Sequence, residues 1–183
     1  MNRRAFVAVL TAVPGLLADS PEAWKITLVS PKEPGEPLVV SGTVYSQDGK
    51  TPLNGMGVYV YQTDADGYYN RPVNDNRNPR IKGWMRTGAD GRYEFRTIKP
   101  APYPGNKIPA HIHVHLSGPN VPQHWVAEYW FAGDKFLKPE DVAANAKLGA
   151  LSAIIDPMKD AAGVWRATRD FRLDPSLFAR NRV

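Results

Sequence analysis

Three of the four histidines in this chain stand within one eight-residue stretch, PAHIHVHL, at residues 109–116. They are His111, His113 and His115, and they alternate with aliphatic residues. In a β-strand alternate side chains share a face, so the imidazoles project from one face and the aliphatic side chains from the other. Alternate residues lie about 7 Å apart at Cα, close enough for two imidazoles to meet at one metal ion. The spacing of the histidines fits either a metal site or a histidine-rich structural strand. It does not identify the metal or the reaction.

Composition narrows the chemistry that such a site could use. The chain has no cysteine, which excludes disulfides, thiolate ligands and thiol nucleophiles. Any metal must therefore be held by histidine, tyrosine or carboxylate. The net charge of +5 is spread over 183 residues without a lysine or arginine block, so we expect no nucleic acid partner. The same charge fits a small anionic substrate.

Short runs with a period of two surround the histidine stretch, and 17 prolines and 15 glycines fall mostly between them. This pattern is typical of an all-β domain, and we predict an antiparallel β-sandwich with long functional loops and one short helix. The length suffices for one domain with its own core. The expected strands are residues 38–45, 56–64, two short strands around GADG within 84–100, 110–118, 125–134 and 164–174, and the expected helix is 138–151.

The N-terminus has the composition of an export signal. Arg3 and Arg4 precede an apolar run, residues 5–18, that is short and interrupted by a Pro-Gly pair. Such a run does not span a bilayer well and predicts a secretory signal of the twin-arginine kind. We therefore expect a signal peptide at residues 1–20 and a single mature domain at 21–183, exported to the periplasm or beyond and not inserted in the membrane. The alternative is a cytosolic protein with an apolar N-terminal segment.

Several longer motifs come in a characteristic order: GEPLVVSGTVYSQDGKTPLNG, YQTDADGYY, RTIKPAPYP, PAHIH and YWFAGD. In this order the chain resembles the intradiol ring-cleavage dioxygenases, the family of protocatechuate 3,4-dioxygenase and catechol 1,2-dioxygenase. The resemblance covers residues 34–134, and RTIKPAPYP and PAHIH are its most specific parts.

The resemblance implies a non-haem Fe(III) cofactor held by two tyrosines and two histidines. It places these ligands at Tyr69, Tyr103, His111 and His113, with Tyr68 as the rival of Tyr69 by one residue. A phenol has a pKa of about 10 in water, and a trivalent cation lowers it by direct charge stabilisation. Anionic oxygen donors favour the ferric state, whereas two histidines and one carboxylate are typical of Fe(II) oxygenases.

The resemblance also implies a reaction. A small aromatic diol and O2 would be the partners, and Tyr103 would leave the iron as a phenolate and take a proton from the diol. Ring cleavage would give a muconate-type diacid. A homo-oligomer is compatible with the sequence, which does not fix the oligomeric state.

Four residues near these motifs are candidates for the pocket. Ile108 stands where the family usually has an arginine that stabilises developing negative charge, a contribution of roughly several kcal/mol. Lys107 is adjacent, although neighbours on an extended segment face opposite ways. Glu128 stands where the family often has glutamine, and His115 lies outside the family pattern.

Two other functions compete with ring cleavage. The chain could bind iron with ring cleavage altered or lost, because Ile108 and Glu128 depart from the family. It could instead be a transthyretin-like or carbohydrate-binding module, in which segments such as SGTVYSQDGKTPLNG also occur. A binding module gives no reason for the tyrosines and the histidine pair to appear together. The tryptophans are expected in the core or the pocket wall rather than on a base-stacking platform: Trp84, Trp125, Trp130 and Trp165.

Overall fold

A computed structural model describes residues 23–72, 74–119 and 121–174. The expected signal peptide lies outside these residues and stays a prediction. In chain order the elements are β1 (Lys25–Thr27), β2 (Pro37–Tyr45), β3 (Gly57–Gln62), β4 (Ile81–Arg86), β5 (Arg92–Ile98), β6 (His111–Gly118), β7 (Val121–Trp125), β8 (Tyr129–Phe131), α1 (Pro139–Asn145), the 3-10 turn η1 (Gly149–Leu151), β9 (Ile154–Ile155), β10 (Met158–Lys159), β11 (Trp165–Thr168) and β12 (Phe171–Arg172).

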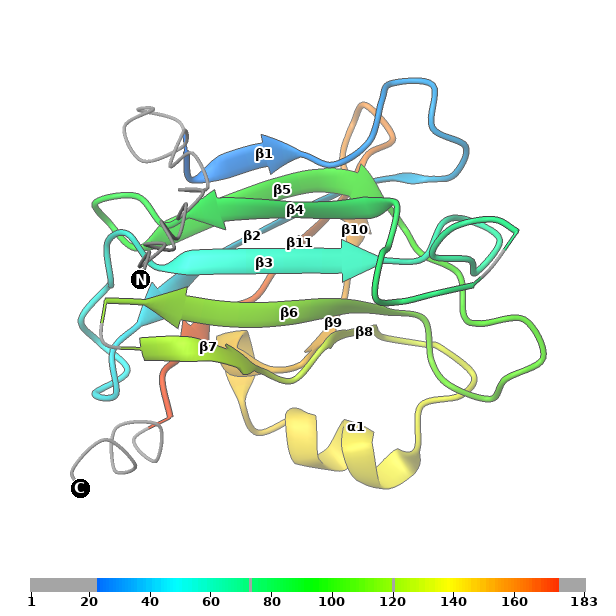
Figure 1. The fold of residues 1–183 in the computed structure, drawn as a ribbon. Helices are drawn as coiled ribbons and strands as arrows, with labels where there is room; N and C mark the ends of the chain where they lie inside the picture. The colour runs from blue at the N-terminus through cyan, green and yellow to red at the C-terminus, as the bar shows by residue number, and fades with distance from the viewer. Residues whose placement is uncertain (1–22, 73, 120, 175–183) are drawn as a thin grey trace, which may run out of the picture.

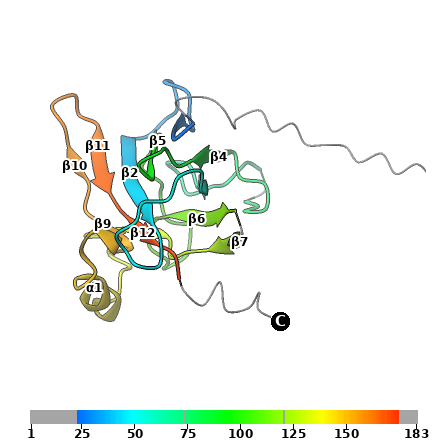
Figure 2. The same cartoon turned by 90° about the vertical axis from the view of Figure 1, so that its left-hand side faces the viewer.

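The strands form two sheets that pack face to face. One sheet has the order β1-β5-β2-β11-β10 with β12 also paired to β2, and the other has the order β4-β3-β6-β8-β9 with β7 also paired to β6. Figure 1 looks onto the second sheet, and Figure 2 shows the two layers from the side, with α1 below them. The predicted all-β sandwich with one short helix is confirmed.

The histidine strand shows why the layers pack. Ile112, Val114 and Leu116 are completely buried, and they join the core with β2 and β5 side chains such as Val40 and Phe95. Each aliphatic side chain moved out of water contributes about 1.5–3 kcal/mol. A shift of one residue in the pairing of β6 would exchange these groups for imidazoles, so burial fixes the register and points the histidines outward.

Two details differ from the predicted layout. The central pairs β2–β5, β3–β4 and β3–β6 are antiparallel, but β1–β5, β11–β2 and β8–β9 are parallel. The strand expected at residues 125–134 is reduced to β8, with Trp125 ending β7, and the strand expected at 164–174 is divided into β11 and β12. The gap between β7 and β8 has a physical cause, because Arg169 Nη1 donates to the carbonyls of Ala127 (2.8 Å) and Glu128 (2.9 Å) and holds them out of the ladder.

The helix is shorter than the predicted residues 138–151. It ends at Asn145, whose side-chain oxygen accepts the backbone N–H of Ala153 at 2.7 Å, and η1 follows. Within the described residues, none of the helices has the length and apolar character needed to cross a membrane.

Three chain segments meet at one end of the sandwich. β3 and β5 both run toward this end and finish there, and β6 begins there, as the right-hand side of Figure 1 shows. The long loops after β3 and β5 therefore lie beside the first residues of the histidine strand. These loops carry the two tyrosines predicted as metal ligands.

Candidate metal centre

Four donor atoms converge at this end of the sandwich. The hydroxyl of Tyr69 contacts that of Tyr103 and lies 2.7 Å from His113 Nε2. The Tyr103 hydroxyl lies 2.8 Å from His111 Nε2 and 3.4 Å from His113 Nε2, and the two imidazole nitrogens are 3.1 Å apart. The structure thus brings together the four residues that the sequence predicted as ligands. Their role as iron ligands stays a prediction.

Each imidazole is held from behind, so that Nε2 faces the other donors. His111 Nδ1 donates to the Pro109 carbonyl at 2.7 Å. His113 Nδ1 lies 2.9 Å from Glu128 Oε1, although the carboxylate sits to one side of the ring N–H direction and the contact is not an aligned hydrogen bond. At His111 the Pro109 carbonyl leaves Nε2 as the unprotonated nitrogen, and a polar oxygen behind Nδ1 is the usual arrangement at a metal-bound histidine.

The loop after β3 positions Tyr69. Asp64 closes a turn in which its carboxylate accepts the N–H of Tyr68 at 3.0 Å, and Gly67 takes the left-handed conformation (φ 88°). A Cβ at Gly67 would lie 2.2 Å from the Pro102 carbonyl oxygen, so glycine lets this loop press against the loop of Tyr103. The Asn74 side chain accepts the Tyr69 N–H at 2.7 Å.

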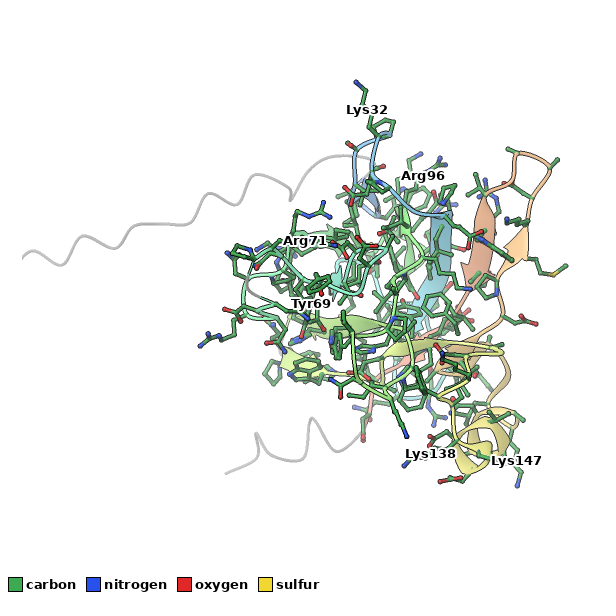
Figure 3. The ribbon with its side chains drawn as sticks, turned by 90° about the vertical axis from the view of Figure 1, so that its right-hand side faces the viewer. Lys32, Tyr69, Arg71, Arg96, Lys138 and Lys147 are labelled. Atoms are coloured by element: carbon green, nitrogen blue, oxygen red, sulfur yellow. The ribbon has the colours of Figure 1, made fainter. Side chains whose placement is uncertain are left out.

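The structure separates the two rival tyrosines. Tyr69 is buried with 4% of its surface exposed, and its hydroxyl is among the donors. Tyr68 packs its ring under the Arg71 guanidinium at 4.5 Å. Figure 3 labels Tyr69 and Arg71 in this loop. The Tyr69 register is therefore the one that the geometry supports.

Tyr103 comes from the second loop and is the least buried of the four donors. Thr63 Oγ1 donates to the Ala101 carbonyl at 2.8 Å and ties this loop to the end of β3. Tyr103 is followed by Pro104 and by Gly105, which also has positive φ (76°). An entering molecule would therefore meet Tyr103 before the other three donors.

Burial disfavours the charged forms of both phenols and of His111. It raises the pKa of both phenols, and for Tyr69 the hydrogen bond with Tyr103 adds to that effect. For Tyr103 burial is the largest cause of the raised pKa, and the hydrogen bond from Tyr69 opposes it in part. Burial lowers the pKa of His111. Two phenols and two imidazoles form a donor set suited to a hard trivalent cation, because that cation supplies the charge that ionises the phenols.

A different ligand set, His111, His113 and Glu128, also has its potential ligand atoms within 4.8 Å of one another. In that set, however, the carboxylate lies at Nδ1 of His113, whereas the tyrosines lie at its Nε2. Glu128 is thus placed behind the histidine rather than beside the other donors. The geometry favours the two-tyrosine, two-histidine site over a facial triad of two histidines and one carboxylate.

Three residues that support the site were not found from the sequence. Asp134 Oδ2 accepts the Ala110 N–H at 2.9 Å and fixes the start of the histidine strand. Arg169 holds the backbone of Glu128, as described above, and the Tyr61 ring stacks on His113 at 4.4 Å. The aspartate of YWFAGD was a signal that could have been used. No local pattern identifies Arg169.

The remaining candidate pocket residues stay outside the donor cluster. Ile108 is 43% exposed and Lys107 is exposed in the same loop. His115 is half-buried, with Nδ1 3.0 Å from the Gln123 side-chain nitrogen. Two tryptophans expected in the core or pocket wall, Trp84 and Trp125, are instead 44% and 56% exposed, because they stand on the outer face of the second sheet.

Comparison with known proteins shows which family this chain resembles. A family model described as dioxygenase matches residues 19–175. The 6-chlorohydroxyquinol 1,2-dioxygenase of Cupriavidus pinatubonensis is 31% identical over 160 residues, which cover 78% of this chain and 55% of that protein. The protocatechuate 3,4-dioxygenase beta chain of Burkholderia cepacia is 37% identical over 131 residues, which cover 66% of this chain and 55% of that one.

Among solved structures, the dioxygenase domain of a dioxygenase and carbohydrate-binding protein fusion from Streptomyces sp. SirexAA-E superimposes with a TM-score of 0.61. The two are 31% identical, and the match covers 81% of this chain and 86% of that domain. The chain spans about half the length of the first two relatives, 55% in each case.

Proposed function

The chain belongs to the intradiol ring-cleavage dioxygenases, and from that premise we propose that it is a non-haem Fe(III) enzyme. In the proposed reaction a catechol-type aromatic diol reacts with O2 to give a muconate-type diacid. Both atoms of the O2 molecule are incorporated into this product. The observation that carries the proposal is the convergence of two phenol oxygens and two imidazole nitrogens through contacts no longer than 3.4 Å.

Tyr69, Tyr103, His111 and His113 are the residues that would hold the ion. A bound ferric ion supplies the Lewis acidity that ionises phenols and the redox chemistry that lets a catecholate react with O2. The protein supplies a rigid strand for the two imidazoles, an acceptor behind each of them, and a phenol from each of two loops.

The two phenols, Tyr69 and Tyr103, differ in the roles that they can have at the metal site. Tyr69 is buried and held by Asn74, which suits a ligand that stays in place throughout. Tyr103 is less buried, so its Oη is the donor atom that an entering diol would meet first. As a phenolate, that oxygen would be placed to accept a proton from the diol hydroxyl.

The first test is the colour of the iron-loaded protein. Tyrosinate-to-Fe(III) charge transfer gives a broad visible band, so the reconstituted protein should be red. Tyr69→Phe should shift or remove the band, whereas Tyr68→Phe, its neighbour beneath Arg71, is the matched control and should leave it unchanged. A colourless protein after reconstitution would refute the iron site.

Turnover needs a separate measurement, namely oxygen uptake with catechol, protocatechuate and hydroxyquinol. Coloured protein that consumes no oxygen with any diol would favour the second candidate, an iron protein with altered or lost ring cleavage. The observation behind that candidate is Ile108, exposed where the family usually has arginine. If the iron-treated protein is colourless, the remaining candidate function is that of a non-catalytic binding module.

We also propose that the protein is exported. The proposal is supported by the Arg3-Arg4 pair and the apolar run that follows it. N-terminal sequencing of protein recovered from the periplasm or the medium should begin near residue 21. Recovery of the whole chain, beginning at Met1, from the cytoplasm alone would contradict export.

A further inference from the structure

Four aromatic side chains form a row across the outer face of the second sheet. Trp84 on β4 is paired with Tyr59 on β3, Tyr59 with His115 on β6, and His115 with Trp125 on β7. Successive ring centroids are 4.5, 5.8 and 4.1 Å apart. We call these four residues the aromatic row.

Both ends of the aromatic row are open to solvent. The exposed fractions of Trp84 and Trp125 are 44% and 56%, and both belong to the small group of exposed large apolar side chains in the described residues. The outer face of an antiparallel sheet is normally polar, so two exposed tryptophans on that face indicate a binding surface. Aromatic rings of this kind bind other rings by stacking and edge-to-face contact.

The aromatic row is continuous with the metal centre. The Trp125 ring lies 5.3 Å from that of His113 and 6.1 Å from that of Tyr61, which itself stacks on His113. His115 follows His113 by two residues on the same face, a step of about 7 Å along the strand. That step is close to the length of one substituted benzene ring.

The exposed area fits a small molecule better than a second protein. A fully exposed aromatic side chain offers about 150–250 Å², so the two tryptophans together expose roughly 200 Å². A stable interface between two copies needs about 800 Å² from each. A planar group attached to a metal-bound ring is therefore the occupant that the size and position favour.

We propose that the aromatic row is a second binding subsite, which holds an aromatic substituent of the diol and gives the protein a preference for diols that carry a second ring. The inference rests on the proposed function, because the diol ring itself must bind at the metal centre. It assigns to His115 a place in the subsite rather than in the metal site.

The test compares two catechols in the iron-loaded protein without oxygen, with the visible band as the readout of binding. 4-Phenylcatechol should bind about tenfold more tightly than 4-methylcatechol, since stacking of one ring contributes about that factor. In Trp125→Ala the ratio of the two dissociation constants should fall toward one, and in Trp84→Ala it should fall partway. Trp24→Ala, which lies beside Arg92 away from the row, is the control and should keep the ratio.

Two outcomes would overturn the inference. A ratio of one in the unmodified protein, or an unchanged ratio in Trp125→Ala, would mean that the row does not contact the substituent. Sedimentation that shows dimers of the unmodified protein and monomers of Trp125→Ala would assign the row to a second copy of the chain.

A separate measurement distinguishes failure of this inference from failure of the proposed function. 4-Phenylphenol cannot chelate a metal, yet it should quench tryptophan fluorescence in the iron-free protein and do so less in Trp125→Ala. Quenching without a visible band in iron-treated protein would support the subsite and refute the iron site. A visible band without quenching would support the iron site and refute the subsite.

Discussion

Replacing Glu128 by glutamine tests whether a charge behind a ligand controls the metal. Its carboxylate lies 2.9 Å from His113 Nδ1, and the Trp130 side chain also hydrogen-bonds it. The contact with His113 is the main cause that lowers the Glu128 pKa, so the group is ionised at neutral pH. Glu128→Gln keeps the shape and removes one negative charge beside the imidazole.

We expect the variant to bind Fe(III) about 10- to 100-fold more weakly, the usual effect of changing a partner behind a metal-bound histidine. Its Fe(III)/Fe(II) midpoint potential should rise, because a carboxylate favours the more highly charged ion. Both quantities can be measured, the first by titration with a competing chelator followed by the visible band, and the second by spectroelectrochemistry.

Glu140→Gln, on the exposed first turn of α1, is the matched control and should change neither quantity. Equal iron affinity and equal potential in Glu128→Gln and the unmodified protein would refute the reasoning. In that case the off-line geometry of the contact would mean that the carboxylate does not act on the metal through His113.

Three other perturbations follow from the same geometry. Ile108→Arg should raise turnover on simple catechols about tenfold or more if a missing positive charge limits the chemistry, and unchanged turnover would mean that another group supplies it. Asp134→Ala leaves the Ala110 N–H without its acceptor and should lower the free energy of unfolding by about 1–3 kcal/mol in urea titrations, with faster iron loss. Stability of the iron-free protein should fall below about pH 6.5, where the unfolded chain takes up a proton that buried His111 resists, and above about pH 10, where Tyr69 resists losing one. A flat urea midpoint from pH 5 to 11 would contradict both linkages.

The parts of the fold that a local pattern fixes were predictable. The period of two in PAHIHVHL separates Ile112 and Val114 from the histidines, and both aliphatic residues are completely buried as that period requires. Spacing alone brought His111 and His113 to one face, but it could not choose between a metal site and a structural strand. The tyrosines came from family resemblance, because no periodicity connects Tyr69 to a strand that begins 42 residues later.

What the sequence could not supply depends on contacts between distant segments. Glu128 lies in a break between β7 and β8 because Arg169, 41 residues away, holds its carbonyl. Residues 125–134 contain a single apolar run in the sequence, which predicts one strand and gives no sign of the break. Trp84 and Trp125 were expected inside for the same reason, since hydrophobic type does not say which face of a sheet the partner layer covers.

The site divides its donors between two kinds of support, and this division predicts how function would be lost. His111 and His113 stand on a strand whose register is fixed by a buried core, so their positions are as stable as the sandwich. Tyr103 stands on a half-buried loop and, in the proposed function, is the donor that an entering diol would meet first. The departures at Ile108 and Glu128 leave all four donors in place. Under the proposed function, changes of this kind would act on substrate charge and on the metal's electronic state, so turnover would change while the donor set is kept.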